Sequence, residues 1–380
     1  MGKPKKARAG AGKKKPGGGG GDAKKPPSSL VAEVAQNEVS TSSAEALADQ
    51  AEVLLQQGDF NEARKLFVVS LEKRPDQPEV MFSLASCLLE LDRPEEARQY
   101  LVRSCELSPD CQPEKWLSLA ELEEGKRSLR CLEKAAALLQ LELAAAPMDE
   151  DSVDHVGESI ADNVDNKENL KQACRRKLSN VYVCISELFT TDLCDEENAE
   201  EMVVSSIGKA LELDPSNPEA VQAKAAYHLI KSEFATAAQE MKRSLDMWLP
   251  AFTRAVEGGL EDADQIPPFN VRLSAVKLLL ELELLDEATT VLDGLVLEDE
   301  DCIDVWYLLG WTNYMRSGDF LPNAKFYLKK AAEVASQCGC DDKSMTDHIQ
   351  ELLEELKEVE SEDDDDDEGW ETTEEDEDDA

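Results

Sequence analysis

Small and apolar side chains recur along this chain in blocks with helical spacing. If Ala44 is counted as the first position, one block contains Leu47 and Ala51, followed by Ala63 and Phe67. Intervals of three and four residues place side chains on one face of an α-helix, and the break inside the block predicts a turn. Each block therefore predicts a hairpin of two amphipathic helices.

The block recurs with a period of 34 residues, first without a gap and then in two later stretches. Small residues at the eighth and twentieth positions and a proline near the end are typical of the tetratricopeptide repeat, whose period is about 34 residues. Small residues let the two helices approach, and proline ends the second helix. Pro250 is expected to end its repeat one position late. The slots of the later repeats are occupied by Met81, Ala85, Leu88, Ala97, Leu101, Ser104, Pro109, Val221, Ala225, Phe234, Ala237, Met241, Ser244, Val276, Leu279, Ala288, Leu292, Leu295, Trp306, Leu309 and Gly310.

These repeats predict an all-α, tetratricopeptide-type helical-hairpin solenoid, a right-handed superhelix whose concave surface is lined by the first helix of each repeat. A disordered basic arm and a disordered acidic tail are expected at the two ends, because both are poor in apolar residues. A helix that continues past Ala331 to about Val359 is expected to cap the array. The expected parts are 1–43 (basic arm), 44–147 (N-terminal repeats), 148–168 (acidic inserted loop), 169–359 (C-terminal repeats and capping helix) and 360–380 (acidic tail).

Charge is distributed unevenly and predicts a cationic partner. The formal net charge is -42, yet residues 1–27 hold nine Lys or Arg and one acid, Asp22, whereas residues 358–380 hold sixteen acids and no base. The part between these ends has 31 basic and 65 acidic residues, and such a surface repels nucleic acid and anionic membranes. We therefore expect a basic protein as partner, with no direct contact to nucleic acid or membrane.

No pattern in the chain indicates catalysis, a cofactor or a metal. The three histidines do not pair with a nucleophile in a known motif, and no phosphate-binding loop is present. Cys338 and Cys340 lack a second cysteine pair or histidine pair at ligand spacing, so two ordinary thiols at a helix end are the simpler interpretation. The sequence predicts a protein that is not an enzyme.

Candidate binding residues follow from the repeat geometry, which directs positions 2, 5, 9, 12 and 13 of each repeat toward the concave surface. Carboxylates interleaved with aromatic rings suit a Lys- and Arg-rich segment, although an acidic protein also has acidic helices for no specific reason. The grouped aromatic residues of the last repeat favour a binding surface more strongly. The candidates are Glu45, Glu52, Glu79, Phe82, Glu90, Glu219, Gln222, Glu281, Asp304, Tyr307, Trp311 and Tyr314.

The basic arm contains two short clusters that are typical of a nuclear import signal. The spacer between them is shorter than in the usual bipartite signal, and a solvated arm that folds back on the acidic tail is the alternative. An import receptor is thus a further expected partner, with the protein in both cytoplasm and nucleus. The clusters are formed by Lys5, Lys6, Arg8, Lys13, Lys14 and Lys15.

Two tryptophan-bearing segments give the chain a more specific resemblance. SLDMWLP ends at Pro250, VWYLLGW ends at Trp311, and the acidic end contains Trp370. Over roughly residues 44–380 the chain resembles the dedicated assembly chaperones of large-subunit ribosomal protein four. The resemblance implies a monomer or one-to-one complex that captures the newly made basic protein, shields it during nuclear import and releases it to the assembling large subunit.

Two functions of other kinds stay open at this point. A histone chaperone would use a similar acidic tail and groove for a different basic client. An adaptor would bind a neutral or helical peptide, and its tail would serve solubility alone. Client binding predicts a strong dependence on salt, whereas the adaptor predicts a weak one.

Overall fold

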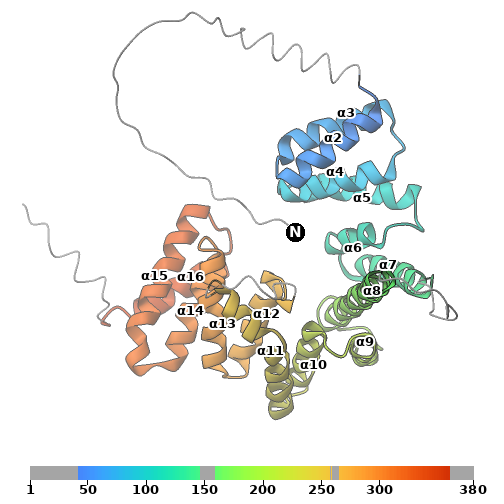
Figure 1. Ribbon diagram of the computed structural model, residues 1–380. Coiled ribbons are helices and arrows are strands. Elements are labelled where there is room, and N and C mark those ends of the chain that lie inside the picture. The colour runs from blue at the N-terminus through green and yellow to red at the C-terminus, as the bar shows by residue number, and fades with distance from the viewer. Residues whose placement is uncertain (1–41, 146–158, 257, 259–264, 360–380) are drawn as a thin grey trace, which may run out of the picture. The chain divides into compact units, whose positions relative to one another are not determined.

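The computed structural model describes residues 42–145, 159–256, 258 and 265–359 (Figure 1). Within them the chain forms the α-helices α2 to α16 and one short 3-10 helix, η2, and no strand. The predicted all-α fold of helical hairpins is therefore confirmed. The predicted acidic tail and nearly all of the predicted basic arm lie outside the described residues.

The chain divides into two compact units, residues 1–199 and 200–380. The first contains α2 (Ala44–Gln57), α3 (Phe60–Lys73), α4 (Pro78–Glu90), α5 (Pro94–Leu107), α6 (Pro113–Glu121), α7 (Gly125–Ala145) and α8 (Ser159–Thr190). The second contains α9 (Ala199–Leu213), which begins at the boundary, α10 (Pro218–Ile230), α11 (Phe234–Val256), α12 (Phe269–Glu281), α13 (Leu285–Glu298), α14 (Ile303–Arg316), η2 (Gly318–Phe320), α15 (Leu321–Cys338) and α16 (Lys343–Glu355).

Local sequence signals set the helix ends. The Ser43 hydroxyl caps α2 by accepting a hydrogen bond from the Ala46 amide at 3.1 Å. Proline occupies the first position of α4 and α10, where its missing N–H is not needed. The predicted small residues at positions eight and twenty, such as Ala51 and Ala63, are fully buried between paired helices.

The turn inside each hairpin places one residue in the left-handed region. The fifteenth position of five hairpins has φ between 54° and 83°, and it is occupied by Gly58, Asp92, Ser232, Glu283 and Ser317. Only the first of these is glycine, which adopts positive φ without a steric cost. The other four hairpins keep the turn at the expense of some backbone strain.

A buried serine ties the two helices of three hairpins together. Its hydroxyl, at the eleventh residue of the second helix, donates to the backbone carbonyl of the first residue of the first helix, 26 residues earlier. We call this hydrogen bond the serine clasp. The three clasps are Ser70 to Ala44 at 2.7 Å, Ser104 to Pro78 at 2.7 Å and Ser244 to Pro218 at 2.8 Å.

The inserted loop expected at residues 148–168 is shorter than predicted. Helix α8 begins at Ser159, so the second half of that range is helical, and residues 146–158 lie outside the described part. Acidic and amide residues do not prevent a helix, but they give this stretch too few apolar positions for a helical period to be recognised. Because α8 belongs to the first unit, the boundary between units lies near residue 199 and not within the insertion.

Helix α11 does not end at Pro250 as the repeat pattern predicts. It runs on to Val256 with the proline inside, and Trp248 and Phe252 are buried on either side of it. The Arg272 guanidinium lies 4.6 Å from the centre of the Phe252 ring and pairs with Glu298 at 2.8 Å. Burial of these rings offsets the hydrogen bond that proline removes.

The capping segment is two helices instead of one. Helix α15 ends at Cys338, Gly339 adopts φ 67° and ψ 44°, and α16 begins at Lys343 after the Asp342 side chain caps it. A glycine in the left-handed region is a common helix terminator, and this signal outweighs the apolar spacing that continues across it. Ile349 and Leu352 of α16 are buried against α15, as their spacing predicts.

Candidate partner-binding surface

In the first two hairpins, Lys and Arg are absent from the first helices, whereas carboxylates occur on both helices. Helices α2 and α4 carry five carboxylates and no Lys or Arg, whereas the Lys and Arg residues of these two hairpins all lie on or beside α3 and α5. Positions 2, 6, 9 and 13 form one stripe of a helix, because they are four, three and four residues apart. We call this stripe the acidic face; its carboxylates are Glu45, Asp49, Glu52, Glu79 and Glu90.

Most of the acidic face lacks a compensating cation. Glu45 pairs with Arg74. The Ser83 hydroxyl of α4 donates to Glu52 of α2, so the parts of the acidic face on these two helices are adjacent. Asp49, Glu79 and Glu90 are exposed and make no ion pair with any described residue. These carboxylates are held on rigid helices and are open to a cation from outside.

Aromatic rings occupy the fifth repeat position of α4 and α6. Phe82 on α4 and Trp116 on α6 are both half-buried and lie one repeat apart. The Trp116 ring is held by its indole N–H, which donates to the Pro109 carbonyl at 3.2 Å. Flat rings next to carboxylates accept the alkyl stems and charged heads of Lys and Arg.

Helix α6 begins with two charged side chains that already have partners, the ion-paired Glu114 and the buried Lys115. Lys115 is fully buried, and its ammonium donates to the carbonyls of Ser104 and Ser108 at the end of α5, where a helix favours positive charge. Glu114 accepts from Lys177 of α8 at 2.7 Å. Partial burial opposes ionisation of Glu114, but its bond to Lys177 holds the pKa of the carboxyl below its usual value. Lys115 therefore presents no positive charge to a partner.

Sequence reasoning missed two members of this surface. Asp49 occupies the sixth position, which was not among the positions assigned to the concave surface, and its spacing of four from Glu45 was the available signal. Trp116 occupies the same slot as Phe82, 34 residues later, and its short, irregular repeat concealed the match.

The candidates on the helices of the second unit lie in mixed surroundings. Gln222 is buried, and its amide donates to the Val271 carbonyl at 3.4 Å, so it joins α10 to α12 and is not open to a partner. Glu219 is half-buried at the start of α10 and Glu281 is exposed at the end of α12. Asp304 accepts from Lys277 at 3.3 Å. No purely acidic stripe forms here.

The aromatic candidates of α14 pack against the capping helix. The Tyr307 hydroxyl lies 2.9 Å from Nδ1 of His348, and the Trp311 and His348 ring centres are 5.0 Å apart. Tyr314 stacks on Trp311 and donates to Glu355. All three rings are half-buried, as Phe82 and Trp116 are, and their contact with a partner stays a prediction. Their contacts attach α16 to the last repeat.

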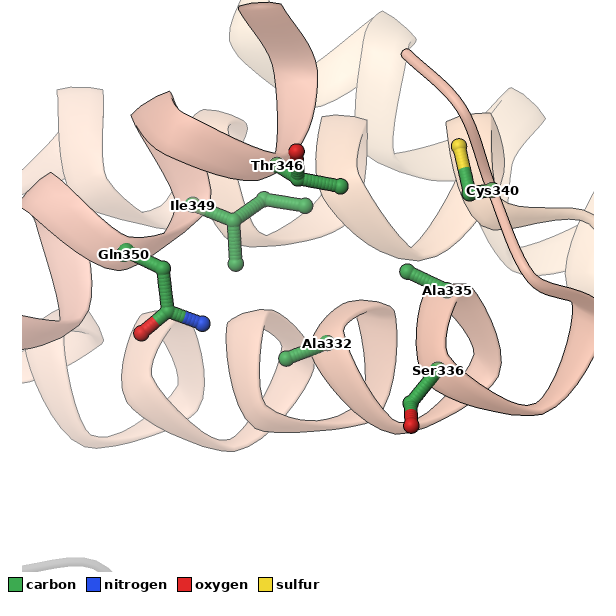
Figure 2. Close-up of a pocket in the computed structure, with 7 residues that line it drawn as sticks. All are labelled: Ala332, Ala335, Ser336, Cys340, Thr346, Ile349 and Gln350. Atoms are coloured by element: carbon green, nitrogen blue, oxygen red, sulfur yellow. The ribbon is translucent and has the colours of Figure 1, made fainter. Parts of the chain in front are cut away.

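A small cavity of about 220 Å³ lies between α15 and α16 (Figure 2). Figure 2 shows Ala332, Ala335 and Ile349 along its apolar wall, with Cys340 at one end. No pair of acid and base groups converges on this cavity. Among the described residues no cluster of metal-ligating side chains occurs, and no helix there is long and apolar enough to cross a membrane. The lysines and arginine of the proposed import signal lie outside those residues.

Known proteins with related sequences and structures identify the family. A tetratricopeptide repeat family model matches residues 54–121. The probable assembly chaperone of rpl4 from Schizosaccharomyces pombe is 32% identical over 68% of this chain and 72% of its own length. The protein of the same description from Emericella nidulans is 28% identical over 70% of this chain and 63% of its own length.

A solved structure agrees with the sequence relatives. The assembly chaperone of RpL4 (Acl4), residues 1–338, is 26% identical and superposes with a TM-score of 0.58 over 72% of this chain and 97% of that one. Fold, family model and sequence relatives thus lead to one assignment. This chain belongs to the family of rpl4 assembly chaperones.

Proposed function

We propose that this protein is a dedicated chaperone of ribosomal protein L4, and that it holds a basic segment of that client on the acidic face. The observation that carries the proposal is the segregation of charge in the first unit: α2 and α4 present carboxylates without any Lys or Arg. A cationic segment is attracted by this stripe and is not repelled by neighbouring cations. Phe82 and Trp116 offer rings beside the carboxylates for the alkyl stems of Lys and Arg.

Shielding is the expected benefit to the client. A newly made ribosomal protein carries basic segments that normally contact RNA, and carboxylates on a folded surface occupy them until RNA replaces the chaperone. The negative charge of the whole chain disfavours its own binding to RNA, so the complex separates when the client reaches its RNA site. No step of this cycle needs catalysis. We expect a one-to-one complex.

We further propose that the complex moves from cytoplasm to nucleus with the help of an import receptor. The lysine clusters of the arm, including Lys5, Lys6 and Lys13, have the chemistry of an import signal. A fusion of residues 1–27 to a fluorescent protein tests this, because the fusion is expected to accumulate in the nucleus. Uniform distribution of the fusion would contradict this part of the proposal.

The acidic face is tested by comparing two variants of equal net charge. The first carries Asp49→Asn, Glu79→Gln and Glu90→Gln; the second carries Glu72→Gln, Glu95→Gln and Glu133→Gln, which change exposed carboxylates on the second helices of hairpins. Purified L4 is titrated into each by calorimetry. We expect the first variant to bind at least tenfold more weakly, about 1.4 kcal/mol, and the second to bind within a factor of two.

Three results would contradict this assignment. Equal weakening of both variants would show that total charge acts and not the acidic face, and unchanged binding by both would remove that face from the contact. Recovery of histones in place of L4, by mass spectrometry after affinity purification from cells, would favour the histone chaperone. Circular dichroism of both variants controls for loss of structure.

A further inference from the structure

The acidic face has a second potential occupant, the basic arm of the same chain. We propose that residues 1–27 dock on the acidic face of α2 and α4 when no client is bound, and that the client displaces them. The docking itself is independent of the identity of the client. Only the displacement rests on the function proposed above.

The arm has the chemistry that the acidic face selects. Its nine Lys and Arg residues are accompanied by a single acid, and Gly and Pro separate the clusters, so an extended conformation brings successive cations along a stripe of carboxylates. Asp49, Glu79 and Glu90 are exposed and have no cation partner among the described residues. Charge complementarity therefore favours this docking without any rearrangement of the helices.

The arm is connected through the chain to the helix that carries most of this face. The arm leads into Ser43, the cap of α2, and α2 itself carries three of the five carboxylates. Residues 28–43 form a connection of sixteen residues that spans up to about 50 Å. Helix α2 is about 21 Å long and adjacent helices lie about 8–10 Å apart, so the whole acidic face is within reach.

Other surfaces of the first two hairpins are less suitable. Helices α3 and α5 carry Arg64, Lys65 and Arg98 among their carboxylates, so they offer a cationic segment a mixed surface, whereas α2 and α4 carry carboxylates without Lys or Arg. A tethered segment has an effective concentration of about millimolar, so even a weak contact is occupied for most of the time. A free client must compete with this internal ligand, and its apparent association constant is the intrinsic one multiplied by the fraction of molecules in which the acidic face is open.

Displacement by a client would also make the lysines of the arm accessible to other proteins. While the lysines contact carboxylates of α2 and α4, they are not available to another acidic protein. When a client occupies the acidic face, the same lysines become accessible. Capture of the client would thus be coupled to exposure of the two lysine clusters of the arm.

Carbodiimide cross-linking of the full chain alone tests the docking. The reagent activates a carboxylate and is converted to a urea while a lysine amine forms an amide with that carboxylate, so only groups in direct contact are joined. In the monomeric fraction we expect links from Lys5, Lys6 or Lys13–Lys15 to Asp49, Glu79 or Glu90. Links from the arm only to residues 358–380, or only between molecules, would overturn the proposal.

A binding experiment without the client gives an independent test. The probe is a synthetic peptide of residues 1–27, and the proteins are the natural full chain and a full-length variant with all nine Lys and Arg of the arm changed to Gln. We expect the peptide to bind the Gln variant at least fivefold more tightly, because its acidic face is open. Equal affinity for both proteins would overturn the proposal.

Substitutions on the acidic face test whether the peptide binds there. Adding Asp49→Asn, Glu79→Gln and Glu90→Gln to the Gln variant is expected to abolish peptide binding, whereas Glu72→Gln, Glu95→Gln and Glu133→Gln should leave it unchanged. An equal loss from both sets would overturn the proposal. Because none of these measurements contains L4, their failure is distinguishable from failure of the chaperone assignment.

Discussion

Two glycines inside helices of the second unit are sites where even a methyl group has no room. A Cβ on Gly310 of α14 would lie 2.6 Å from Leu328 Cγ of α15, and one on Gly294 of α13 would lie 2.3 Å from Phe252 Cζ of α11. Gly310 occupies the eighth position of its repeat, where the repeat pattern predicts a small residue. At Gly294 the pattern makes no such prediction, because the helix that contacts it is the part of α11 beyond Pro250.

Gly310→Ala is expected to destabilise the protein by about 1–3 kcal/mol, since the added methyl group overpacks a fully buried contact. Gly208→Ala in α9 is the matched control, because nothing lies within 4 Å of the Cβ position there. Alanine is better than glycine inside a helix, so the control should gain about 0.5–1 kcal/mol. Urea unfolding followed by circular dichroism measures both; equal effects would disprove the close contact.

Ser317 holds a strained hairpin turn. Its φ of 54° and ψ of -169° lie in a region that is essentially restricted to glycine. Ser317→Gly should therefore stabilise the protein by about 1 kcal/mol, after the greater entropy of unfolded glycine is subtracted. Gly58→Ala, at the same position of the first hairpin, should have the opposite sign. Thermal unfolding that shows a loss for Ser317→Gly would contradict this account.

At the scale of helices, repeat spacing predicted where hairpins form better than where helices end. The paired alanines and the serines of the clasps were at the expected positions because each satisfies a contact inside one hairpin. Helix α11 passed its proline because burial of Trp248 and Phe252 depends on α12 and α13, which a single block does not reveal. Helix α8 was missed in part because its first residues are polar.

The serine clasp joins the two helices of a hairpin by a buried hydrogen bond, so its loss should destabilise the hairpin. Ser104→Ala removes the hydrogen bond to the Pro78 carbonyl and is expected to cost about 1 kcal/mol. The control is Ser86→Ala, because the Ser86 hydroxyl donates only within its own helix, to Phe82 at 3.2 Å, and a change below about 0.5 kcal/mol is expected. Hydrogen exchange should accelerate at the ends of α4 and α5 in the first variant alone.

The candidate surface was predicted in part from the sequence. Glu45, Glu52, Glu79, Phe82 and Glu90 lie on α2 and α4, where repeat geometry placed them. The contacts of the α14 aromatic group with α16 were not predicted, because α16 follows a break at Gly339 that the apolar spacing concealed. Contact of the candidate residues with a partner stays a prediction. Repeat geometry gives the direction in which a side chain points and does not identify what binds to it.

At the scale of the whole molecule, net charge dominates encounters with other proteins. A formal charge of -42 repels copies of the chain from one another and attracts cationic proteins over distances set by salt. The attraction of a cationic protein is expected to be strong at α2 and α4, because no Lys or Arg on these helices neutralises their carboxylates.

Binding of L4 is therefore expected to depend strongly on ionic strength. Raising salt from about 0.1 M to about 1 M shortens the Debye length from about 10 Å to about 3 Å, and the association rate should fall at least tenfold. Surface plasmon resonance with the chaperone immobilised measures this rate. A rate that changes less than twofold would favour the adaptor, whose contact with a neutral peptide does not rely on charge.

The serine clasps also have a mechanical consequence. A pulling force applied to the ends of the chain must break a buried bond between residues 26 apart before either helix of a clasped hairpin can unwind. Such hairpins should yield in single steps, each releasing about 34 residues and roughly 110–120 Å of contour length. Hairpins without the serine, such as α12 with α13, should extend more gradually and at lower force.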